Sequence, residues 1–392
     1  MTDKFGQSEM NEIPSGWEEC IFSEAVDVNP KRELKKGSTA KFVSMAELRE
    51  FNKKIQGFTV RQFSGGSKFV NGNTLMARIT PCLENRKTAF VDILKSDEVG
   101  CGSTEFIVLG GKDNKSTDQF VYYLAISPMI RQAAIKSMTG TSGRQRVESG
   151  VFDKLIINLP EIVEQRAIAK VLSDLDEKIE LNNQMNKTLE AMGQALFKRW
   201  FVDFEFPGHE KTKLVKGIPD GWHQGALGEI CTIESGKRPE AKSDSRTEEC
   251  AVPLIGASSV MGYVKTLLYN EPILIIGRVG THGVVQRVLP PSFPSDNTLV
   301  IRPKYYEYIY QVLKTIDYDS LNVGTTQPLI TQTAVKKHDT LIPSDNILEK
   351  FETAISPLFI KVAANNQESD VLACIRDSLL PKLMSGKIRM VQ

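Results

Sequence analysis

Two stretches of the chain place apolar side chains at alternating spacings of three and four residues. The first stripe consists of Leu172, Leu175, Ile179, Asn182, Asn186, Leu189, Gly193 and Leu196. The second stripe consists of Ile355, Leu358, Val362, Asn365, Ser369, Leu372, Arg376 and Leu379. Such spacing is typical of the a and d positions of a coiled coil. Each member of the first stripe has its counterpart 183 positions later, so the sequence predicts two long helices that share one phase.

Both stripes become polar at mid-length, through Asn182 and Asn186 in the first and through Asn365 and Ser369 in the second. A buried asparagine fixes the register of paired helices at a cost in stability. We therefore expect the two helices to pair antiparallel within the chain and to hold two globular units apart. A helix of about 40 residues would be roughly 60 Å long. The alternative is that each helix packs on its own globular unit.

The rest of the chain is also duplicated, with more drift. The segment IPSGW at residues 13–17 recurs as IPDGW at 218–222, and LMAR at 75–78 recurs as IIGR at 275–278. Short β-rich runs at 104–109, 155–159, 273–276 and 298–302 are punctuated by Gly, Pro and Asn, and helical periodicity occurs near 119–136 and 305–315. The sequence predicts a mixed α+β fold with two pseudo-repeated α/β units, at residues 1–160 and 205–343. Each unit is followed by a helical region, at 161–204 and 344–392, and the two helices are expected to form an antiparallel coiled coil.

Composition narrows the class of protein. The 392 residues are 41% hydrophobic and 25% charged, which is ordinary for a globular protein and excludes a disordered chain. With 49 Lys and Arg against 48 Asp and Glu, the net charge is +1, so any nucleic acid must be bound by local basic patches. The six cysteines form no CxxC pair, residues 1–11 are polar, and no run approaches the roughly 18 apolar residues of a membrane helix. We expect a soluble cytoplasmic protein that does not enter a membrane.

The sequence contains none of the common catalytic motifs. It has no GxxxxGK[ST], no GxGxxG after a strand, no HExxH and no GxSxG. The segment LPPSF at 289–293 looks like an amino-methyltransferase tetrad but lacks the leading Asp or Asn, so a loop is the better interpretation. We therefore expect no catalytic residue and no metal site on this chain.

Polar and basic residues recur at corresponding loop positions of the two units. The candidate DNA-contacting residues are Lys68, Arg78, Thr80, Arg86, Lys87, Arg144, Gln145, Arg146, Lys237, Arg238, Arg278, Thr281, His282, Thr325, Thr326 and Gln327. Arginine can pair bidentately with guanine and glutamine with adenine, whereas lysine and threonine contact phosphate. The alternative is that these are ordinary solvated side chains. For Arg78 and Arg278, which follow apolar strands at matching places, an anchoring role inside each unit is an equal alternative.

Three further segments carry a family resemblance. The helix opening LPEIVEQRAI at 159–168, the run ALFKRWFVDF at 195–204 and the segment LLPKLMSGKIR at 379–389 resemble the conserved regions of the specificity subunit of type I restriction-modification systems. The openings at 13–17 and 218–222 are similar to the starts of its target recognition domains. One departure is that the second helix opens as PSDNILEK at 343–350 and lacks the pair Glu164-Gln165 of the first.

The resemblance implies a function as well as a fold. Residues 1–160 and 205–343 would be target recognition domains that each read one half of an asymmetric, bipartite site on double-stranded DNA. The coiled coil would set the spacer between the halves. Two methyltransferase subunits that carry S-adenosylmethionine would dock on the helices. Motor-nuclease subunits that use ATP and magnesium would join for restriction, and this chain would hold no cofactor. Two other hypotheses stay open: a self-contained DNA methyltransferase or nuclease, and a two-module scaffold that binds no nucleic acid.

Overall fold

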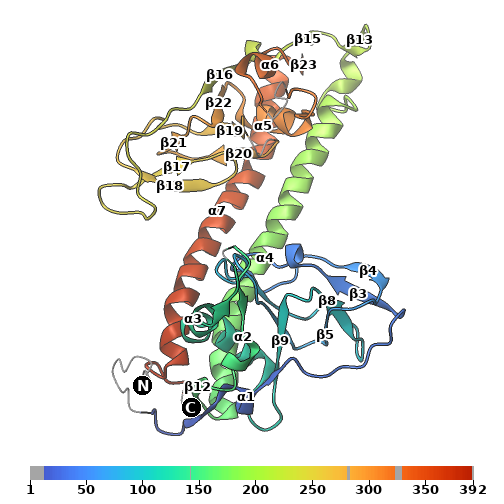
Figure 1. Cartoon of the computed structure of the whole chain (residues 1–392). Helices are drawn as coiled ribbons and strands as arrows, with labels where there is room; N and C mark the ends of the chain where they lie inside the picture. Colours follow the sequence, from blue (N-terminus) through green and yellow to red (C-terminus); the bar gives the residue numbers. More distant parts are fainter. Residues whose placement is uncertain (1–12, 142, 280–282, 323–328, 391–392) are drawn as a thin grey trace. The chain divides into compact units, whose positions relative to one another are not determined.

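The computed structural model describes residues 13–141, 143–279, 283–322 and 329–390. The chain forms two compact units (Figure 1): unit 1 comprises Met1–Gln184 and Asn365–Gln392, and unit 2 comprises Met185–Ala364. The long helices α4 (Ile162–Phe201) and α7 (Asp345–Met384) each contain 40 residues, and each is divided between the units. We call the globular part that precedes α4 domain 1 and the part between α4 and α7 domain 2.

The halves of α4 and α7 pack antiparallel within each unit. In unit 1, Leu172 near the start of α4 shares a core with Leu380 and Leu383 near the end of α7. In unit 2, Phe197 near the end of α4 packs on Phe351 near the start of α7, with ring centroids 6.3 Å apart. Every residue of the two stripes is buried or half-buried. The predicted pairing of the two helices is confirmed.

The polar middle of the seam joins the helices in unit 1. The Asn182 side chain is fully buried, and its Nδ2 donates hydrogen bonds to Glu368 Oε2 at 2.9 Å, Ser369 Oγ at 3.3 Å and the Asn365 carbonyl oxygen at 3.4 Å. Because a one-turn slip would remove all three acceptors from the buried amide, Asn182 specifies the register of the pair.

Neither long helix belongs to a single domain. Ile168 and Leu172 of α4 lie in the core of domain 1, whereas Phe197 and Trp200 lie in the core of domain 2. The alternative of one helix on one globular unit is therefore not what the chain adopts.

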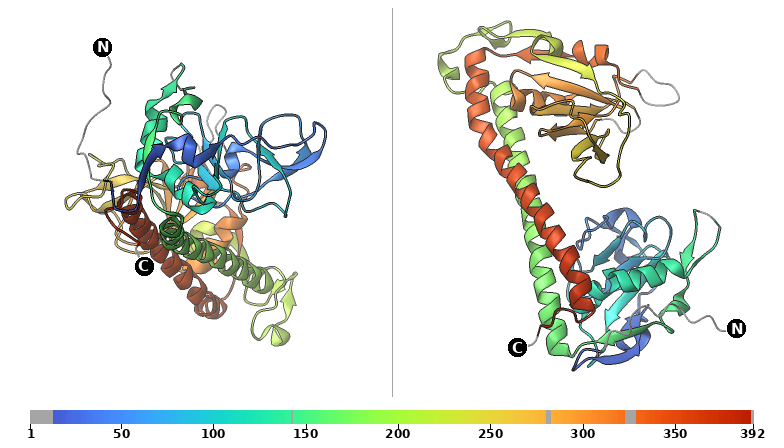
Figure 2. Two further views of the ribbon diagram at one scale, coloured as in Figure 1. Left: turned by 90° about the horizontal axis from the view of Figure 1, so that it is seen from below. Right: turned by 90° about the vertical axis from the view of Figure 1, so that its left-hand side faces the viewer.

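Domain 1 is built on an antiparallel sheet of order β2-β9-β6-β7. Helix α2 packs on one face of this sheet and α3 follows it after Ser127 (Figure 2). A second sheet of order β4-β3-β8-β5 lies beside it, and β1 pairs with β12 just before α4 begins. The bounds are β1 (Glu18–Ile21), β2 (Val26–Val28), β3 (Thr39–Val43), β4 (Thr59–Gln62), β5 (Ser67–Phe69), β6 (Thr74–Ala77), β7 (Thr88–Phe90), β8 (Gly100–Gly102), β9 (Phe106–Gly111), α2 (Asp118–Ile126), α3 (Pro128–Lys136) and β12 (Ile156–Leu159).

Domain 2 repeats this plan. Its main sheet has the order β16-β22-β19-β20, with α5 against it, and a smaller sheet has the order β18-β17-β21. The pair β15 and β23 closes the domain before α7. The bounds are β15 (His223–Ala226), β16 (Cys231–Ser235), β17 (Val252–Ile255), β18 (Val260–Val264), β19 (Ile273–Gly277), β20 (Val285–Val288), β21 (Phe293–Pro294), β22 (Thr298–Pro303), α5 (Tyr306–Thr315), α6 (Gln332–Lys336) and β23 (Asp339–Ile342). The connections contain α1 (Phe22–Ala25), β10 (Met138–Thr139), β11 (Arg146–Val147), β13 (Leu214–Val215) and β14 (Ile218–Pro219).

Strand register shows that the two main sheets are equivalent. At the end of β6, Ala77 pairs with Phe106 of β9, and at the end of β19, Gly277 pairs with Thr298 of β22. The next residue is Arg78 in one domain and Arg278 in the other. The predicted duplication and the mixed α+β fold class are thereby confirmed.

Candidate nucleic-acid interface

Arg78 and Arg278 occupy the same place in the two domains and use their backbones identically. The Arg78 amide donates to the Glu105 carbonyl at 3.0 Å, and the Arg78 carbonyl accepts from the Val147 amide at 2.8 Å. The Arg278 amide donates to the Asn297 carbonyl at 3.0 Å, and its carbonyl accepts from the Ile330 amide at 2.9 Å. We call the segment that precedes the last strand of each domain the late loop: residues 140–146 in domain 1, and the residues between Asn322 and Leu329 in domain 2. In each domain, the chain that returns after this segment is therefore attached to the end of the central strand, β6 or β19.

Each arginine side chain uses only some of its hydrogen-bond donors within its own domain. Arg78 Nη2 donates to the Val147 carbonyl at 3.0 Å, and Arg278 Nη1 donates to Ser235 Oγ at 3.4 Å. In both residues Nε is buried without a hydrogen-bond partner among the described residues. An anchoring role is thus present, and each guanidinium keeps donors for a ligand.

The late loop of domain 1 is fixed at its base by Thr80. The Thr80 amide donates to the Gln145 carbonyl, and Thr80 Oγ1 accepts from the Gln145 amide, both at 3.0 Å. Arg146 Nη2 lies 2.7 Å from Glu105 Oε1, and these hydrogen bonds lower the pKa of the Glu105 carboxyl. Arg144 is exposed. Arg146 is exposed as well. Because Arg146 is paired with Glu105, Arg144 is the exposed arginine of this segment that forms no ion pair with a described residue.

The other candidates do not form one surface. Arg86 Nη1 lies 3.5 Å from Asp377 of α7, and Lys87 Nζ donates to the Met45 carbonyl at 3.4 Å. Lys237 and Arg238 are exposed after β16. The candidates Thr281, His282, Thr325, Thr326 and Gln327 lie outside the described residues.

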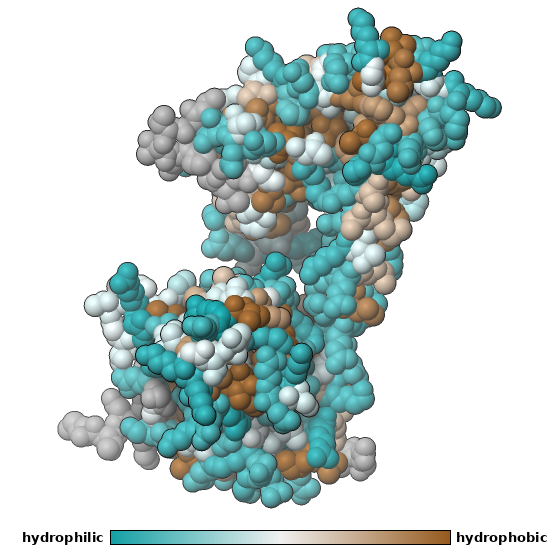
Figure 3. Space-filling model, turned by 90° about the vertical axis from the view of Figure 1, so that its right-hand side faces the viewer, coloured by the Kyte–Doolittle hydropathy of each residue, from teal (hydrophilic) through white to brown (hydrophobic). Residues whose placement is uncertain are grey.

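Lys68 and Arg78 meet in a cleft of about 610 Å³ on domain 1. Lys31 and Arg32, which the sequence analysis did not select, also line it. A signal for them existed, because a Lys-Arg pair follows the first strand of the main sheet in both domains, at 31–32 and at 237–238. The side of unit 1 that carries β3 and β4 is mostly hydrophilic, with apolar patches among the polar side chains (Figure 3).

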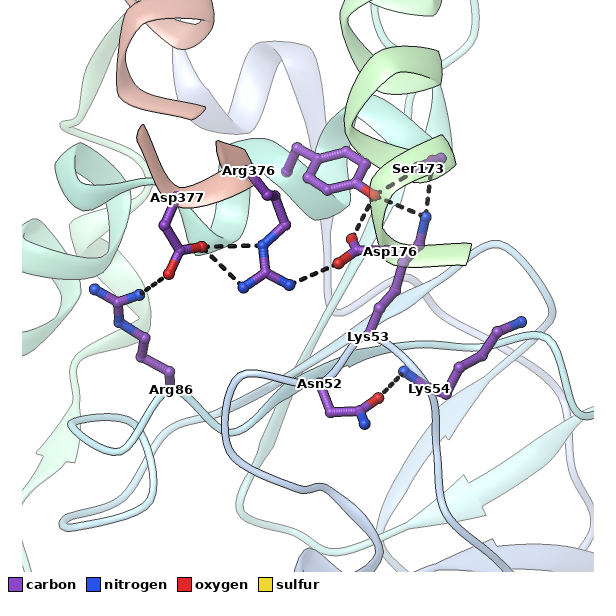
Figure 4. Close-up of polar contacts among 9 residues, drawn as sticks. Asn52, Lys53, Lys54, Arg86, Ser173, Asp176, Arg376 and Asp377 are labelled. Atoms are coloured by element: carbon purple, nitrogen blue, oxygen red, sulfur yellow. Dashed lines mark hydrogen bonds and ion pairs between the residues drawn. The ribbon is translucent and has the colours of Figure 1, made fainter. Parts of the chain in front are cut away.

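A buried polar network joins domain 1 to the helices (Figure 4). Lys53 Nζ donates to Gln119 Oε1 at 2.9 Å, to Ser173 Oγ at 2.9 Å and to Tyr123 OH at 3.1 Å. The Tyr123 hydroxyl donates to Asp176 Oδ2 at 2.6 Å. Arg376 Nη1 donates to Asp176 Oδ1, also at 2.6 Å, so residues of domain 1, α4 and α7 form one network. Burial lowers the pKa of Lys53 to about 8.

The first turn of α4 shows what the pair Glu164-Gln165 does. Glu164 accepts hydrogen bonds from Trp17 Nε1 at 2.9 Å and from Arg389 Nε at 2.8 Å, and the Arg389 contact contributes most to lowering the pKa of the Glu164 carboxyl. The fully buried Gln165 accepts from the Thr117 amide and donates to the Lys115 and Pro160 carbonyls. The pair therefore fastens domain 1 and the C-terminal segment to the start of α4.

Domain 2 meets the helices through aromatic rings. Phe201 lies 4.8 Å from both Tyr308 and Phe351, centroid to centroid, and Trp200 lies 5.6 Å from Phe351. Arg287 stacks over Phe359 at 4.2 Å and forms an ion pair with Glu307. Contacts between aromatic rings and the buried ion pair of Arg287 with Glu307 therefore join domain 2 to the helices, whereas a polar network does so in unit 1.

The described part of the chain lacks two further features. No group of three or more His, Cys, Asp or Glu side chains there could hold a metal ion. No helix there combines the length and the apolar character that crossing a membrane requires.

Comparison with known proteins places these features in a family. The family model described as the type I restriction modification DNA specificity domain matches the chain twice, at residues 29–191 and 219–372. The MjaIX type I restriction enzyme specificity subunit of Methanocaldococcus jannaschii is 31% identical, over 69% of this chain and 69% of that protein. The HindI specificity subunit of Haemophilus influenzae is 25% identical, over 81% of this chain and 86% of that protein. The crystal structure of a type I restriction-modification S subunit from M. genitalium has the same fold, with a TM-score of 0.60, 20% identity and coverage of 96% of this chain and 98% of that one. The chain therefore belongs to the family of type I restriction-modification DNA specificity subunits.

Proposed function

We propose that this chain selects the DNA sequence on which a type I restriction-modification complex acts, and that domains 1 and 2 each bind one half of an asymmetric bipartite site. Two matches to the DNA specificity domain on one chain carry this proposal. The chain after the late loop is attached in the same way in both domains, by Val147 to Arg78 and by Ile330 to Arg278, and this supports the proposal because one scaffold then carries two segments of different sequence. Unlike loops read unlike half-sites, so the target is not palindromic.

The partners follow from the family and from the chemistry of this chain. Two methyltransferase subunits dock on α4 and α7 and supply S-adenosylmethionine, and motor-nuclease subunits supply ATP and magnesium chemistry. The domain limits that go with this proposal are 1–160 and 205–343 for the recognition domains and 161–204 and 344–392 for the helical regions. DNA is bound through phosphate contacts, so affinity falls steeply with salt.

Methylation mapping tests the proposal directly. The chain is co-expressed with the methyltransferase subunits of its system, and methylated adenines are mapped by single-molecule sequencing. We expect a bipartite, asymmetric motif that disappears without this chain. Arg144→Ala should alter one half of the motif and leave the other half unchanged. Transfer of labelled methyl groups by the purified chain alone would contradict the proposal, and so would a complex whose DNA binding is insensitive to salt.

The helix pair is proposed to set the spacer between the half-sites. Removal of residues 183–189 from α4 and 360–366 from α7 keeps the heptad phase of both helices and shortens the pair by about 10 Å, or about three base pairs. The mapped motif should then have a spacer shorter by about three base pairs with unchanged half-sites. An unchanged spacer in an active, folded variant would show that the helices do not set it.

A further inference from the structure

The cleft on domain 1 is lined by basic and neutral groups. Its charged lining residues are Lys31, Arg32, Lys68 and Arg78, and Ser67 and Thr104 add hydroxyl groups. No acidic residue lines it, and none of the four basic side chains forms an ion pair with a described residue. Four cations around one recess that no acidic residue lines favour the binding of an anion there.

The geometry of the cleft is held by the fold. Lys68 Nζ donates to the Arg32 carbonyl at 3.1 Å, which fixes the segment after β2 against the start of β5. Arg32 Nε and Arg78 Nε are buried and have no hydrogen-bond partner among the described residues. An oxyanion in the cleft would accept charge-assisted hydrogen bonds from the guanidinium and ammonium groups that line it.

Domain 2 repeats the arrangement at the equivalent sheet edge. Val28 pairs with Leu109, the fourth residue of β9, and Ile233 pairs with Ile301, the fourth residue of β22, so the first strands are in equivalent register. Lys31-Arg32 follow Val28 by three and four positions, and Lys237-Arg238 follow Ile233 by four and five. Arg278 reaches toward the same segment through its hydrogen bond to Ser235. A feature kept in both drifted copies is more than a chance cluster of charges.

We propose that this cleft, formed by Lys31, Arg32, Lys68 and Arg78, binds backbone phosphates of one DNA strand, and that Lys237, Arg238 and Arg278 form its counterpart in domain 2. The inference rests on the proposed function and adds to it the residues that fix DNA on each domain. Two of the four cations are lysines, which act as point charges and suit phosphate oxygens. Contacts to phosphate fix the position of a protein on the duplex, whereas contacts to base edges read its sequence. Because Arg78 also anchors the late loop, a phosphate held here places that loop in a fixed register on the duplex.

The test uses the complex of the full chain with its methyltransferase subunits and a duplex that contains the mapped target site. Affinity is measured from about 50 to 200 mM salt for the wild type and for Arg32→Ala/Lys68→Ala. The double variant should bind about tenfold more weakly or worse, and its slope of log affinity against log salt should be smaller by about one to two. Its methylation motif should keep every base of the wild-type motif.

A charge-matched control separates a local site from general loss of charge. Lys112→Ala/Lys115→Ala removes two cations from the turn after the opposite end of β9, where Lys115 pairs with the exposed Glu18. This control should keep the wild-type salt slope, and thermal unfolding should show that both double variants are folded.

The possible failures can be told apart. A wild-type complex that does not bind the duplex would overturn the proposed function together with this inference. Normal wild-type binding with an unchanged slope in Arg32→Ala/Lys68→Ala would overturn the phosphate site alone. A relaxed base position in the motif of that variant would also overturn it, because the cleft would then read a base.

Discussion

The two units bury opposite chemistry at equivalent positions of the duplicated helices. At the offset of 183 residues, Asp176 and Arg376 of unit 1 correspond to Phe359 and Gly193 of unit 2. In unit 1 the pair is a buried ion pair with a 2.6 Å contact. In unit 2, the Phe359 ring lies against Gly193, where an added Cβ would be 3.2 Å from the ring. The same position between the two helices therefore holds an ion pair in unit 1 and an aromatic ring in unit 2.

The same contrast appears where each domain joins its helix. Glu164 and Arg389 of unit 1 correspond to Ile347 and Phe206 of unit 2. Arg389 lies over the Trp17 ring at 5.8 Å and binds Glu164, whereas Phe206 packs on Trp222 at 4.9 Å and Ile347 joins the apolar core. The second helix lacks the Glu-Gln pair because an apolar junction takes its place in unit 2.

The apolar junction of unit 2 and the polar junction of unit 1 contribute differently to stability and to structural specificity. Apolar contacts are non-directional, and aromatic rings bury large areas, so unit 2 gains stability from its junction. A buried ion pair is offset by desolvation and contributes little net stability, but it tolerates only the geometry in which every charge is paired. We expect the junction of unit 1 to be the more sensitive to pH and to register, and the junction of unit 2 to be the more sensitive to lost volume.

The largest effect is expected from Phe359→Ala. It removes a ring that is 2% exposed and leaves a cavity beside Gly193, so unit 2 should lose about 3–5 kcal/mol of unfolding free energy. Hydrogen exchange in α5 of unit 2 and α2 of unit 1 measures the effect, and α2 should keep its protection. Equal loss of protection in α2 would show that the two junctions are not independent.

Arg376→Met should come next, at about 3 kcal/mol in unit 1. It leaves Asp176 buried without its cation, and the hydrogen bond from Tyr123 keeps the loss at the lower end of the usual range. The double variant Asp176→Leu/Arg376→Met should recover most of the loss, because an apolar pair then fills the site as in unit 2. Denaturant unfolding of both variants measures the difference, and a double variant no more stable than the single one would contradict the comparison.

The pH dependence of Lys53 should be smaller, at about 2 kcal/mol between pH 7 and 9.5. The folded pKa of about 8 lies below the ordinary value of 10.5. The unfolded state therefore binds more protons in this range, and unit 1 gains stability as the pH rises. The stability difference between wild type and Lys53→Met isolates this contribution. It should shift in favour of the wild type with rising pH, and a flat difference would show that Lys53 is not desolvated.

Glu164→Gln should have the smallest effect, about 1–2 kcal/mol, through weaker hydrogen bonds to Arg389 and Trp17. Because the folded pKa of Glu164 is lowered, its contribution is present above the ordinary pKa of 4.5 and is lost as the pH falls below it. The stability difference between the wild type and Glu164→Gln, measured by denaturant unfolding, should therefore shrink as the pH falls below 4.5. Ile347→Val is the matched control in unit 2, and its effect should not depend on pH.

Sequence reasoning was most successful where the signal is local or repeated. Helix periodicity and the 183-residue offset predicted α4, α7 and their pairing, and IPSGW with LMAR predicted the duplicated domains. For the loops, the candidate DNA contacts stay predictions: the sequence grouped Arg86 and Lys87 with Arg78, and in the structure Arg86 contacts Asp377 and Lys87 contacts the Met45 carbonyl. The sequence pattern did not identify Lys31 and Arg32, because the number of positions between them and Lys237-Arg238 differs from the number between the corresponding residues of the preceding strands.

The sequence by itself determined that this protein is a duplicated pair of mixed domains on two long helices, because hydrophobic periodicity and repeats are carried by neighbouring residues. Only the tertiary structure decided which stripe positions hold charges in pairs and which basic residues share a cleft. Those facts depend on contacts such as Asp176 with Arg376, 200 positions apart, and Arg86 with Asp377, 291 positions apart. A buried charge is tolerated only where folding brings its partner to it, and that partner cannot be identified from the spacing of residues along the chain.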